Sequence, residues 1–500
     1  MRRRGFGPFF YSPVFCVPST MRRPFFVFAV VCLLAVVLVQ CRKNSQNSPE
    51  SGIPQPVDLD FEKIRARGYI TALVDNNSVS FFIYKGRTMG YEYEMLQRLA
   101  KHLKIELKVK VISGIEEAII RLNKGEGDIV AFPLTVTEER KKVVAFTTPH
   151  FTTSQVLVQK KPANWRMQPT SMWEKSLLRN PVELAGKQVH VLKNSSFAER
   201  LQNLSREIGG GIQIVEDSAD AQTESLIRKV ATGEIKYTVT DQTLAQVNQL
   251  YYPNLDISTV LSTPQQIGWA VRLNAPVLLT QIDTWLIQSR KNGIQPILYR
   301  KYFESPRSTM QRFASDYSTL TANNLSPFDS KFKDQAAIIG WDWRLLAAIA
   351  FQESNFDPKV ESWAGAIGLM QVMPETGEFF KAKDLTNVDE NIRTGVRLLK
   401  FLDDNWKKTI DDEEQRVKFV LASYNAGLGH VLDARNLAKK YGYNPTVWDD
   451  QVEAFMTRKA IPQYYRDPVV QAGYCRCDEP VRYVKAVLDR YEEYKAHIAE

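Results

Sequence analysis

The segment Trp341–Pro374, WDWRLLAAIAFQESNFDPKVESWAGAIGLMQVMP, constrains the fold of this chain more than any other. An N-capping aspartate followed by strong helix formers predicts a helix over Asp342–Ser354. Leu346, Ile349 and Glu353 lie at helical spacing on one face of this helix. The carboxylate of Glu353 is therefore expected on an apolar stripe.

A glutamate in that position has two interpretations. Glutamate is rarely buried without a partner, and apolar surroundings raise the pKa of Glu353 because they disfavour its charged form. A glutamic acid that keeps its proton near neutral pH can act as a general acid on a glycosidic oxygen. The alternative is a glutamate at the helix end that reaches water or caps a neighbour. The helix by itself leaves both open.

The residues after this helix predict a tight loop. Gly365, Gly368 and Pro374 break up a segment that also carries Met370 and Gln371. Such a composition is unfavourable for a plain helix and typical of a loop folded against a cleft.

The ordered motifs of this region resemble those of the soluble lytic transglycosylase domain. They are Glu353-Ser354, Gly365-Ala366, Gly368-Leu369-Met370-Gln371 with Met373-Pro374, and Tyr424-Asn425-Ala426-Gly427. The resemblance implies an all-α, lysozyme-like fold in which Glu353 is the only catalytic acid and base. It also implies substrate contacts at Ser354, Ser362, Met370, Gln371, Tyr424, Asn425 and Tyr483. Simple packing is the alternative for Tyr483, which falls in an amphipathic helix expected over Pro480–Tyr494.

No motif singles out the second carboxylate that a two-carboxylate glycosidase requires. Asp357 is nearest in sequence, but Phe356-Asp357-Pro358 predicts a turn that closes the helix. The resemblance implies a route with one glutamate, in which Glu353 protonates the leaving oxygen and then deprotonates the muramyl 6-hydroxyl. The substrate's own N-acetyl group stabilises the developing charge, and the product is a 1,6-anhydromuramyl end. A sensor that holds glycan without turnover and a hydrolytic muramidase are the alternatives.

Residues 58–304 alternate short apolar runs with helical stretches. We expect strands over Tyr69–Val74, Leu107–Val111, Asp128–Pro133, Gln188–Leu192, Tyr237–Thr240 and Ile267–Val271. We expect helices over Tyr91–Leu103, Ile115–Lys124, Ser196–Leu204, Ala221–Thr232 and Pro276–Arg290. This alternation predicts parallel α/β layers, with the last strand and helix returning to a first lobe.

This region resembles the family-3 solute-binding proteins of the amino-acid-binding type. The resemblance rests on Phe81-Phe82 through Gly90-Tyr91, on Gly127-Asp128, and on Thr137-Glu138-Glu139-Arg140 before Ala145-Phe146-Thr147-Thr148-Pro149. It implies that Arg140 holds the α-carboxylate of a ligand, which suits a planar guanidinium, and that Asp241 holds the α-amine. Ser195 and Ser196 are expected at a turn that offers hydroxyls and backbone N–H groups to an anion. An ordinary surface arginine is the alternative for Arg140.

The first 50 residues are expected to be a targeting leader. Two arginines precede the apolar run Phe25–Val39, which is too short for a comfortable membrane span and typical of a signal-peptide core. Cys41 follows and resembles a lipoprotein cysteine that is acylated after cleavage. An uncleaved anchor or an ordinary secretory signal is the alternative, and Met21 is an alternative start.

Composition narrows the remaining possibilities. The net charge of +9 is compatible with an anionic surface such as cell wall or lipid headgroups, and too diffuse to indicate nucleic acid. The sequence has no phosphate-binding loop and no zinc-type ligand spacing, so we expect neither a cofactor nor a metal. Outside the leader the only cysteines are Cys475 and Cys477, for which we expect a structural role.

These observations predict four segments. They are a leader over 1–50 with a mature start at Cys41, a solute-binding-like domain over 58–304, a linker or short connecting helix over 305–326, and a transglycosylase domain over 327–500. In the last we also expect helices near Lys331–Gly340, Glu390–Asn405 and Arg416–Ala426. We therefore expect an enzyme that cleaves peptidoglycan strands at the periplasmic face of the cell envelope, anchored to the outer membrane by lipid. An amino acid or muropeptide bound to the front domain is expected to regulate or target it.

Overall fold

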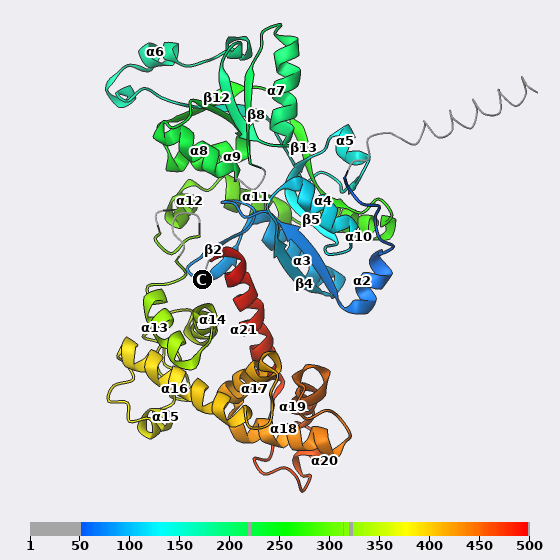
Figure 1. Cartoon of the computed structure of the whole chain (residues 1–500), viewed down its shortest axis with the longest axis vertical. Coiled ribbons are helices and arrows are strands. Elements are labelled where there is room, and N and C mark those ends of the chain that lie inside the picture. Colours follow the sequence, from blue (N-terminus) through cyan, green and yellow to red (C-terminus); the bar gives the residue numbers. More distant parts are fainter. Residues whose placement is uncertain (1–51, 219–221, 314, 320–323, 499–500) are drawn as a thin grey trace, which may run out of the picture. The chain divides into compact units, whose positions relative to one another are not determined.

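The computed structural model of the chain describes residues 52–218, 222–313, 315–319 and 324–498 (Figure 1). Residues 55–500 belong to one compact unit. Within the described ranges, no helix is both long enough and apolar enough to pass through a membrane. The predicted leader, including Met21 and Cys41, lies outside the described residues.

The first lobe of the front domain is a mixed sheet covered by helices (Figure 1). Its strands are β1 (Tyr69–Val74), β4 (Glu106–Val111), β5 (Ile129–Thr135), β6 (Ala145–Phe146), β7 (Phe151–Thr153) and β13 (Gln265–Val271), beside the hairpin β2 (Phe82–Tyr84) and β3 (Arg87–Met89). Its helices are α2 (Phe61–Arg67), α3 (Tyr91–Leu103), α4 (Ile115–Asn123), α5 (Glu138–Lys141), α10 (Pro276–Lys291) and α11 (Ile294–Phe303). The strand order is β4-β1-β5-β13-β6, with β7 paired to β13. β1, β4 and β5 are parallel as predicted, whereas β13 is antiparallel to β5.

The second lobe has its own sheet of five strands in the order β10-β9-β11-β8-β12. These are β8 (Gln155–Lys160), β9 (Gln188–Leu192), β10 (Gln213–Asp217), β11 (Tyr237–Asp241) and β12 (Leu255–Val260). The helices are α6 (Thr170–Trp173), α7 (Ser196–Glu207), α8 (Thr223–Thr232) and α9 (Gln242–Tyr251). β9 is parallel to β10 and β11, whereas β8 is antiparallel to both β11 and β12. The two-lobed α/β fold is confirmed, but both sheets are mixed rather than wholly parallel.

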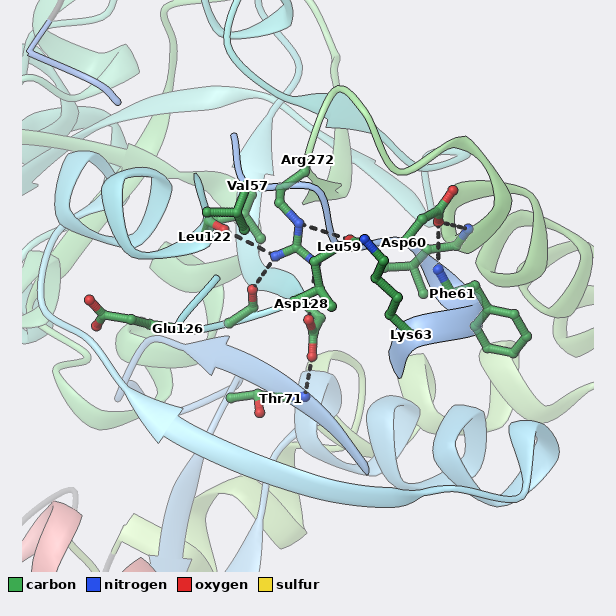
Figure 2. A network of polar contacts seen from close by, with 12 residues as sticks. Val57, Leu59, Asp60, Phe61, Lys63, Thr71, Leu122, Glu126, Asp128 and Arg272 are labelled. Carbon is green, nitrogen blue, oxygen red and sulfur yellow. Dashed lines mark hydrogen bonds and ion pairs between the residues drawn. The ribbon is translucent and has the colours of Figure 1, made fainter. Parts of the chain in front are cut away.

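The Gly127-Asp128 motif ties the start of the described chain to the first lobe (Figure 2). Asp128 and Arg272 have no exposed surface, and Arg272 Nη2 lies 3.0 Å from Asp128 Oδ1. The Thr71 backbone N–H donates to the other carboxylate oxygen at 2.8 Å, and Arg272 Nε donates to the Leu59 carbonyl at 3.1 Å. Breaking such a buried ion pair by removing one partner costs about 3–5 kcal/mol, so the motif supports the fold rather than ligand binding.

The rear domain is all-α, as predicted (Figure 1). Its helices are α13 (Asp329–Ile339), α14 (Trp343–Ser354), α15 (Pro374–Phe379), α16 (Val388–Trp406), α17 (Glu413–Ala426), α18 (Leu428–Lys440), α19 (Glu453–Arg458), α20 (Pro462–Tyr465) and α21 (Asp478–His497). α14 runs through the core, where Leu346 and Ile349 are fully buried in one cluster with Leu399, Phe419 and Val487. The other helices therefore surround the segment that carries Glu353.

Both ends of α14 follow from local chemistry. The Asp342 carboxylate accepts from the Arg344 backbone N–H at 2.8 Å and caps the helix, as predicted. Asn355 and Phe356 then adopt positive φ angles of 52° and 63°, which stops the helix. Asp357 accepts from the Lys359 backbone N–H at 2.9 Å, so the predicted turn is present.

Two elements connect the front and rear domains. The helix α12 (Pro306–Phe313) occupies the first part of the expected linker. α21 contacts the β2–β3 hairpin, because the Tyr494 hydroxyl donates to the Gly86 carbonyl at 2.8 Å. The Glu493 carboxylate, from the residue just before Tyr494, accepts from the Tyr93 hydroxyl at 3.0 Å. α21 is thus held by side chains of both domains.

Candidate functional site

Glu353 lies in the last turn of α14, with its carboxyl group facing α21. The Tyr483 hydroxyl donates to Glu353 Oε1 at 2.5 Å. Burial raises the pKa of Glu353 to about 7, the Tyr483 hydrogen bond lowers it, and the negative charge of Glu479 raises it. Within the described residues, Glu353 has no ion pair with a lysine or arginine. A carboxyl group in this environment keeps a large share of its proton at neutral pH.

Glu479 is an acidic group that the sequence did not reveal. It lies one helical turn before Tyr483 on α21, at the i, i+4 spacing that places two side chains on one face. Its side chain is exposed, and its charge acts on Glu353 across more than 100 residues of sequence. No local pattern around Glu479 signals this proximity.

Tyr424, at the end of α17, is the third member of this group. Burial and the charge of Glu353 together raise the pKa of Tyr424 well above its ordinary value. Its hydroxyl donates to the Met370 carbonyl at 2.7 Å rather than to Glu353. Asn425, the next residue, is exposed. The structure therefore brings Tyr424 and Tyr483 to Glu353 as expected.

The Gly368–Gln371 segment is a tight loop, and Met370 within it is fully buried. The Asn391 side chain accepts from the Met370 backbone N–H at 2.9 Å. A Cβ at Gly368, where φ is +77°, would lie 2.5 Å from the side-chain amide nitrogen of Asn391. This close approach and the positive φ account for the glycine. Gln371 Nε2 donates to the Gly368 carbonyl at 2.9 Å and so closes the loop on itself.

The hydroxyls of the two serines expected at the substrate form hydrogen bonds with backbone groups in this structure. Ser354 is buried, and its hydroxyl lies 3.0 Å from the carbonyls of Ala350 and Leu369. The Ser362 hydroxyl accepts from the Ala366 backbone N–H at 2.9 Å. In this structure both serines hold the loop that follows α14.

The two cysteines outside the leader lie beside a histidine that is distant from them in the sequence. Cys475 and Cys477 are joined in a disulfide, and a nitrogen of His430 lies within 4.8 Å of both sulfurs. Lys459 Nζ lies 3.0 Å from His430 Nδ1 and 2.7 Å from the Asp433 carboxylate. Sulfurs in a disulfide are not thiolate ligands, and a lysine next to the imidazole opposes a cation. The disulfide in the loop that precedes α21 instead packs against His430.

The four ligand-binding candidates of the front domain line one cavity of about 290 Å³. They are Arg140, Asp241, Ser195 and Ser196. Arg140 Nη1 donates to the Thr135 carbonyl at 2.9 Å. Ser195 caps α7 by accepting from the Ala198 backbone N–H at 3.2 Å, and Gln155 Nε2 donates to the Ser196 hydroxyl at 3.4 Å. Residues far apart in the sequence are thus brought together as the resemblance implied.

Arg140 and Asp241 supply opposite charges to this cavity. Burial raises the pKa of Asp241 to about 7, and the positive charge of Arg140 opposes that rise. Burial likewise lowers the pKa of Arg140, while the charges of Glu199 and Asp241 raise it. Asp241 Oδ1 is buried without a hydrogen-bond partner in the described structure. A carboxylate oxygen in that state is suited to receive a donor from a bound molecule.

Comparison with known families assigns both domains. Residues 70–305 match the family of bacterial extracellular solute-binding proteins, family 3, and residues 330–447 match the transglycosylase SLT domain. Among solved structures, an arginine-bound truncated ArgBP from T. maritima is 25% identical, covers 46% of this chain and 100% of its own, and has a TM-score of 0.39. An ancestral arginine-binding protein bound to arginine is 24% identical, covers 47% and 99%, and has a TM-score of 0.40.

Relatives that span both domains are similar over most of the chain. The membrane-bound lytic murein transglycosylase F of Desulfosudis oleivorans is 33% identical over 433 residues, which are 87% of this chain and 91% of the relative. Its counterpart from Pseudomonas putida (strain W619) is 31% identical over 438 residues, 86% of each chain. The chain therefore belongs to the membrane-bound lytic murein transglycosylase F family of peptidoglycan-cleaving lyases, with a solute-binding module before its SLT domain.

Proposed function

We propose that Glu353 is the sole acid and base of a lytic transglycosylase reaction that leaves 1,6-anhydromuramyl ends. The observation that supports this best is the Glu353 carboxyl group, which has a pKa of about 7 and one hydrogen bond, from Tyr483. Since the Tyr483 hydroxyl donates to Oε1, we place the proton of Glu353 on Oε2. In the described part of the chain no hydrogen bond reaches Oε2, which leaves it available to a substrate.

The first step is proton donation. Glu353 Oε2 gives its proton to the oxygen between N-acetylmuramic acid and N-acetylglucosamine, and the bond from that oxygen to the muramyl C1 breaks. The substrate's own N-acetyl oxygen stabilises the positive charge that develops at C1. The carboxylate left behind is stabilised by the Tyr483 hydrogen bond, since a bond to an ionised acceptor is stronger than one to a neutral acceptor.

The second step reverses the direction of proton transfer. The Glu353 carboxylate takes the proton of the muramyl 6-hydroxyl, whose oxygen attacks C1 and closes the 1,6-anhydro ring. Glu353 is then protonated again, and no water has been added. One group with a pKa near the working pH can serve in both steps.

A hydrolytic muramidase is the second candidate, and Glu479 is the observation that favours it. A second carboxylate could activate a water on the opposite face of the sugar, as in inverting glycosidases. Glu479 is the acidic residue whose charge acts on Glu353. In our preferred route it only raises the pKa of Glu353.

Mass spectrometry of muropeptides released from purified peptidoglycan separates the two reactions. The lytic route gives products one water lighter than those of hydrolysis. We expect anhydro products from the wild type and from Glu479→Gln alike. Reducing-end muramic acid as the main product, lost in Glu479→Gln, would establish the hydrolytic reaction instead.

We further propose that the front domain binds an amino acid or muropeptide and adjusts the activity of the rear domain. Arg140 and Asp241 would hold its α-carboxylate and α-ammonium groups. α21 offers a physical connection, because Tyr483 binds Glu353 while Tyr494 binds the β2–β3 hairpin. Two-lobed domains close around ligand by hinge motion, and closure affects the rear domain if it changes how α21 is held.

We also propose that the chain is a lipoprotein of the outer membrane, anchored through Cys41. The names of its relatives support an association with the membrane. Metabolic labelling with a fatty acid, compared between the wild type and Cys41→Ser, tests the anchor. Label that persists in Cys41→Ser would refute it.

A further inference from the structure

The front cavity has an excess of acidic side chains. Asp75, Glu224 and Asp241 line it together with Arg140. The other charged residues in its lining are Glu116, Glu117 and Lys193, all exposed. In the described ranges, no lysine or arginine forms an ion pair with Asp75 or Glu224. The cavity therefore holds two half-buried carboxyl groups, those of Asp75 and Glu224, that have no cationic partner among the described residues.

Asp75 and Glu224 come from different lobes. Asp75 follows β1 in the first lobe, and Glu224 lies in the first turn of α8 in the second. Ser78, three residues after Asp75, spans the gap, because its backbone N–H donates to Glu224 Oε2 at 3.1 Å and its hydroxyl donates to Oε1. The two lobes thus meet at this acidic pair.

The donors that surround the pair are neutral. Asn77 Nδ2 donates to Asp75 Oδ2 at 3.0 Å, and Asn248 Nδ2 donates to Glu224 Oε1 at 2.9 Å. Burial raises the pKa of both carboxyl groups, to about 6 for Asp75, and the charge of Glu224 raises the pKa of Asp75 further. Hydrogen bonds orient these groups, but they do not cancel the repulsion between them.

The charges of an α-amino acid leave this pair unmatched. The ligand's α-carboxylate would neutralise the charge of Arg140, and its α-ammonium would neutralise the charge of Asp241. Asp75 and Glu224 then remain, and carboxylates that are partly withdrawn from water are costly without a cation. A positive charge on the ligand's side chain would satisfy both groups and would favour the closed arrangement of the lobes.

We propose that this cavity recognises an α-amino acid group whose side chain carries a second positive charge, and that Asp75 and Glu224 bind that charge. The inference rests on the proposed ligand function of Arg140 and Asp241 and adds the class of ligand. A free basic amino acid and a stem-peptide residue with a free side-chain ammonium share this chemistry.

Calorimetry on the full chain near neutral pH tests the proposal. The panel is L-arginine, L-lysine, L-glutamine, L-glutamate, and a stem peptide with a free side-chain ammonium beside the same peptide acetylated there. We expect the cationic ligands to bind roughly 30-fold or more tightly than glutamine, since losing one partner of a buried charge pair has about that effect. Binding by the free amino acids alone, or by the peptide alone, supports the proposal and identifies the source.

Variants locate the selectivity. Asp75→Asn and Glu224→Gln should each reduce the preference for arginine over glutamine by roughly tenfold or more, while glutamine binding shows that the cavity is intact. Glu139→Gln is the matched control, because it removes an exposed carboxylate of the same domain whose side chain is 70% accessible. Its preference for arginine should be unchanged.

Two failures are distinguishable. If glutamine or glutamate binds the wild type as tightly as arginine, with binding lost in Arg140→Ala, the cationic class is wrong and the proposed ligand site stands. If arginine binds Arg140→Ala with unchanged affinity, the proposed ligand site itself is wrong. Binding by no member of the panel overturns both.

Discussion

Glu353 in the rear domain and Asp241 in the front domain have nearly the same pKa in different electrostatic surroundings. Burial raises both to about 7. Glu353 lies near a second negative charge, that of Glu479, which favours its protonated form. Asp241 lies near the positive charge of Arg140, which favours its ionised form.

The comparison shows that burial alone does not decide the role of a carboxyl group. A like charge and a neutral hydroxyl suit Glu353 to the proposed role of a proton donor that recovers its proton. An opposite charge suits Asp241 to the proposed role of a partner for a ligand ammonium. Substitutions of these neighbours, or of the groups themselves, therefore test the two proposed roles.

Replacing Glu353 by glutamine should have the largest effect. Turnover of peptidoglycan should fall about 10²- to 10⁴-fold, because an amide cannot donate and then recover a proton. Glycan binding, measured by co-sedimentation with peptidoglycan, should persist. Glu378→Gln, an exposed residue of α15, is the control and should turn over at the wild-type rate. Activity of Glu353→Gln within about tenfold of the wild type would remove Glu353 from its role.

The same substitution should stabilise the protein at higher pH. The folded state holds the Glu353 proton between its ordinary pKa of 4.5 and about 7, whereas the unfolded state releases it. The free energy of unfolding therefore falls as pH rises through that window, by about 1.4 kcal/mol per pH unit. The Glu353→Gln variant does not show this fall in the free energy of unfolding, because glutamine does not titrate. Urea denaturation should show a larger advantage of Glu353→Gln over the wild type above the window than below it, and an advantage independent of pH would contradict the assigned pKa.

The proposed ligand site of Asp241 and Arg140 is tested by substituting the arginine. A saturating ligand of the front domain should change the wild-type turnover roughly 5- to 150-fold, the usual range of allosteric coupling. Arg140→Ala should lose both this response and the rise in melting temperature on adding ligand. Lys142→Ala, whose exposed ammonium pairs with Glu139, should keep both. A ligand that binds through Arg140 without changing turnover would show that the module only tethers or localises the enzyme.

Removing the Tyr483 hydroxyl should have the smallest effect. Turnover should fall about tenfold in Tyr483→Phe, the effect of losing one hydrogen bond to a charged group. Because that bond lowers the pKa of Glu353, the high-pH limit of activity should move to higher pH. Tyr491 lies on the same helix as Tyr483, and its hydroxyl donates to Asp342 at 3.0 Å; Tyr491→Phe is therefore the control and should leave that limit in place. A shift toward lower pH in Tyr483→Phe would show that the hydroxyl acts otherwise.

Local patterns predicted much of the fold. The bounds of β1, β9 and α3 agree with the sequence, because apolar periodicity and turn residues define them within one segment. β8, β10 and β12 were missed; β8 and β12 pair antiparallel with each other although most of the second lobe's sequence lies between them. The antiparallel direction of β13 was missed for a related reason, because it depends on the chain's return from the second lobe.

The candidate sites were predictable only where a motif carried them. Glu353 and Arg140 lie within ordered motifs, and the structure gives both the surroundings expected of their roles. Glu479 and Glu224 have no motif, and each is brought to its site by tertiary packing. Ser354 and Ser362 were assigned to substrate by resemblance, and that stays a prediction; the sequence did not indicate the hydrogen bonds that both form with backbone groups.

The proposed reaction depends on Glu353 keeping its proton near neutral pH. The carboxylic-acid band in the infrared difference between the wild type and Glu353→Gln measures this directly, because only Glu353 contributes to the difference. We predict that the band titrates with a midpoint near pH 7 and that Glu479→Gln lowers this midpoint. A midpoint near the ordinary value of 4.5 would contradict the account, because Glu353 would then be ionised at neutral pH and unable to act as the acid.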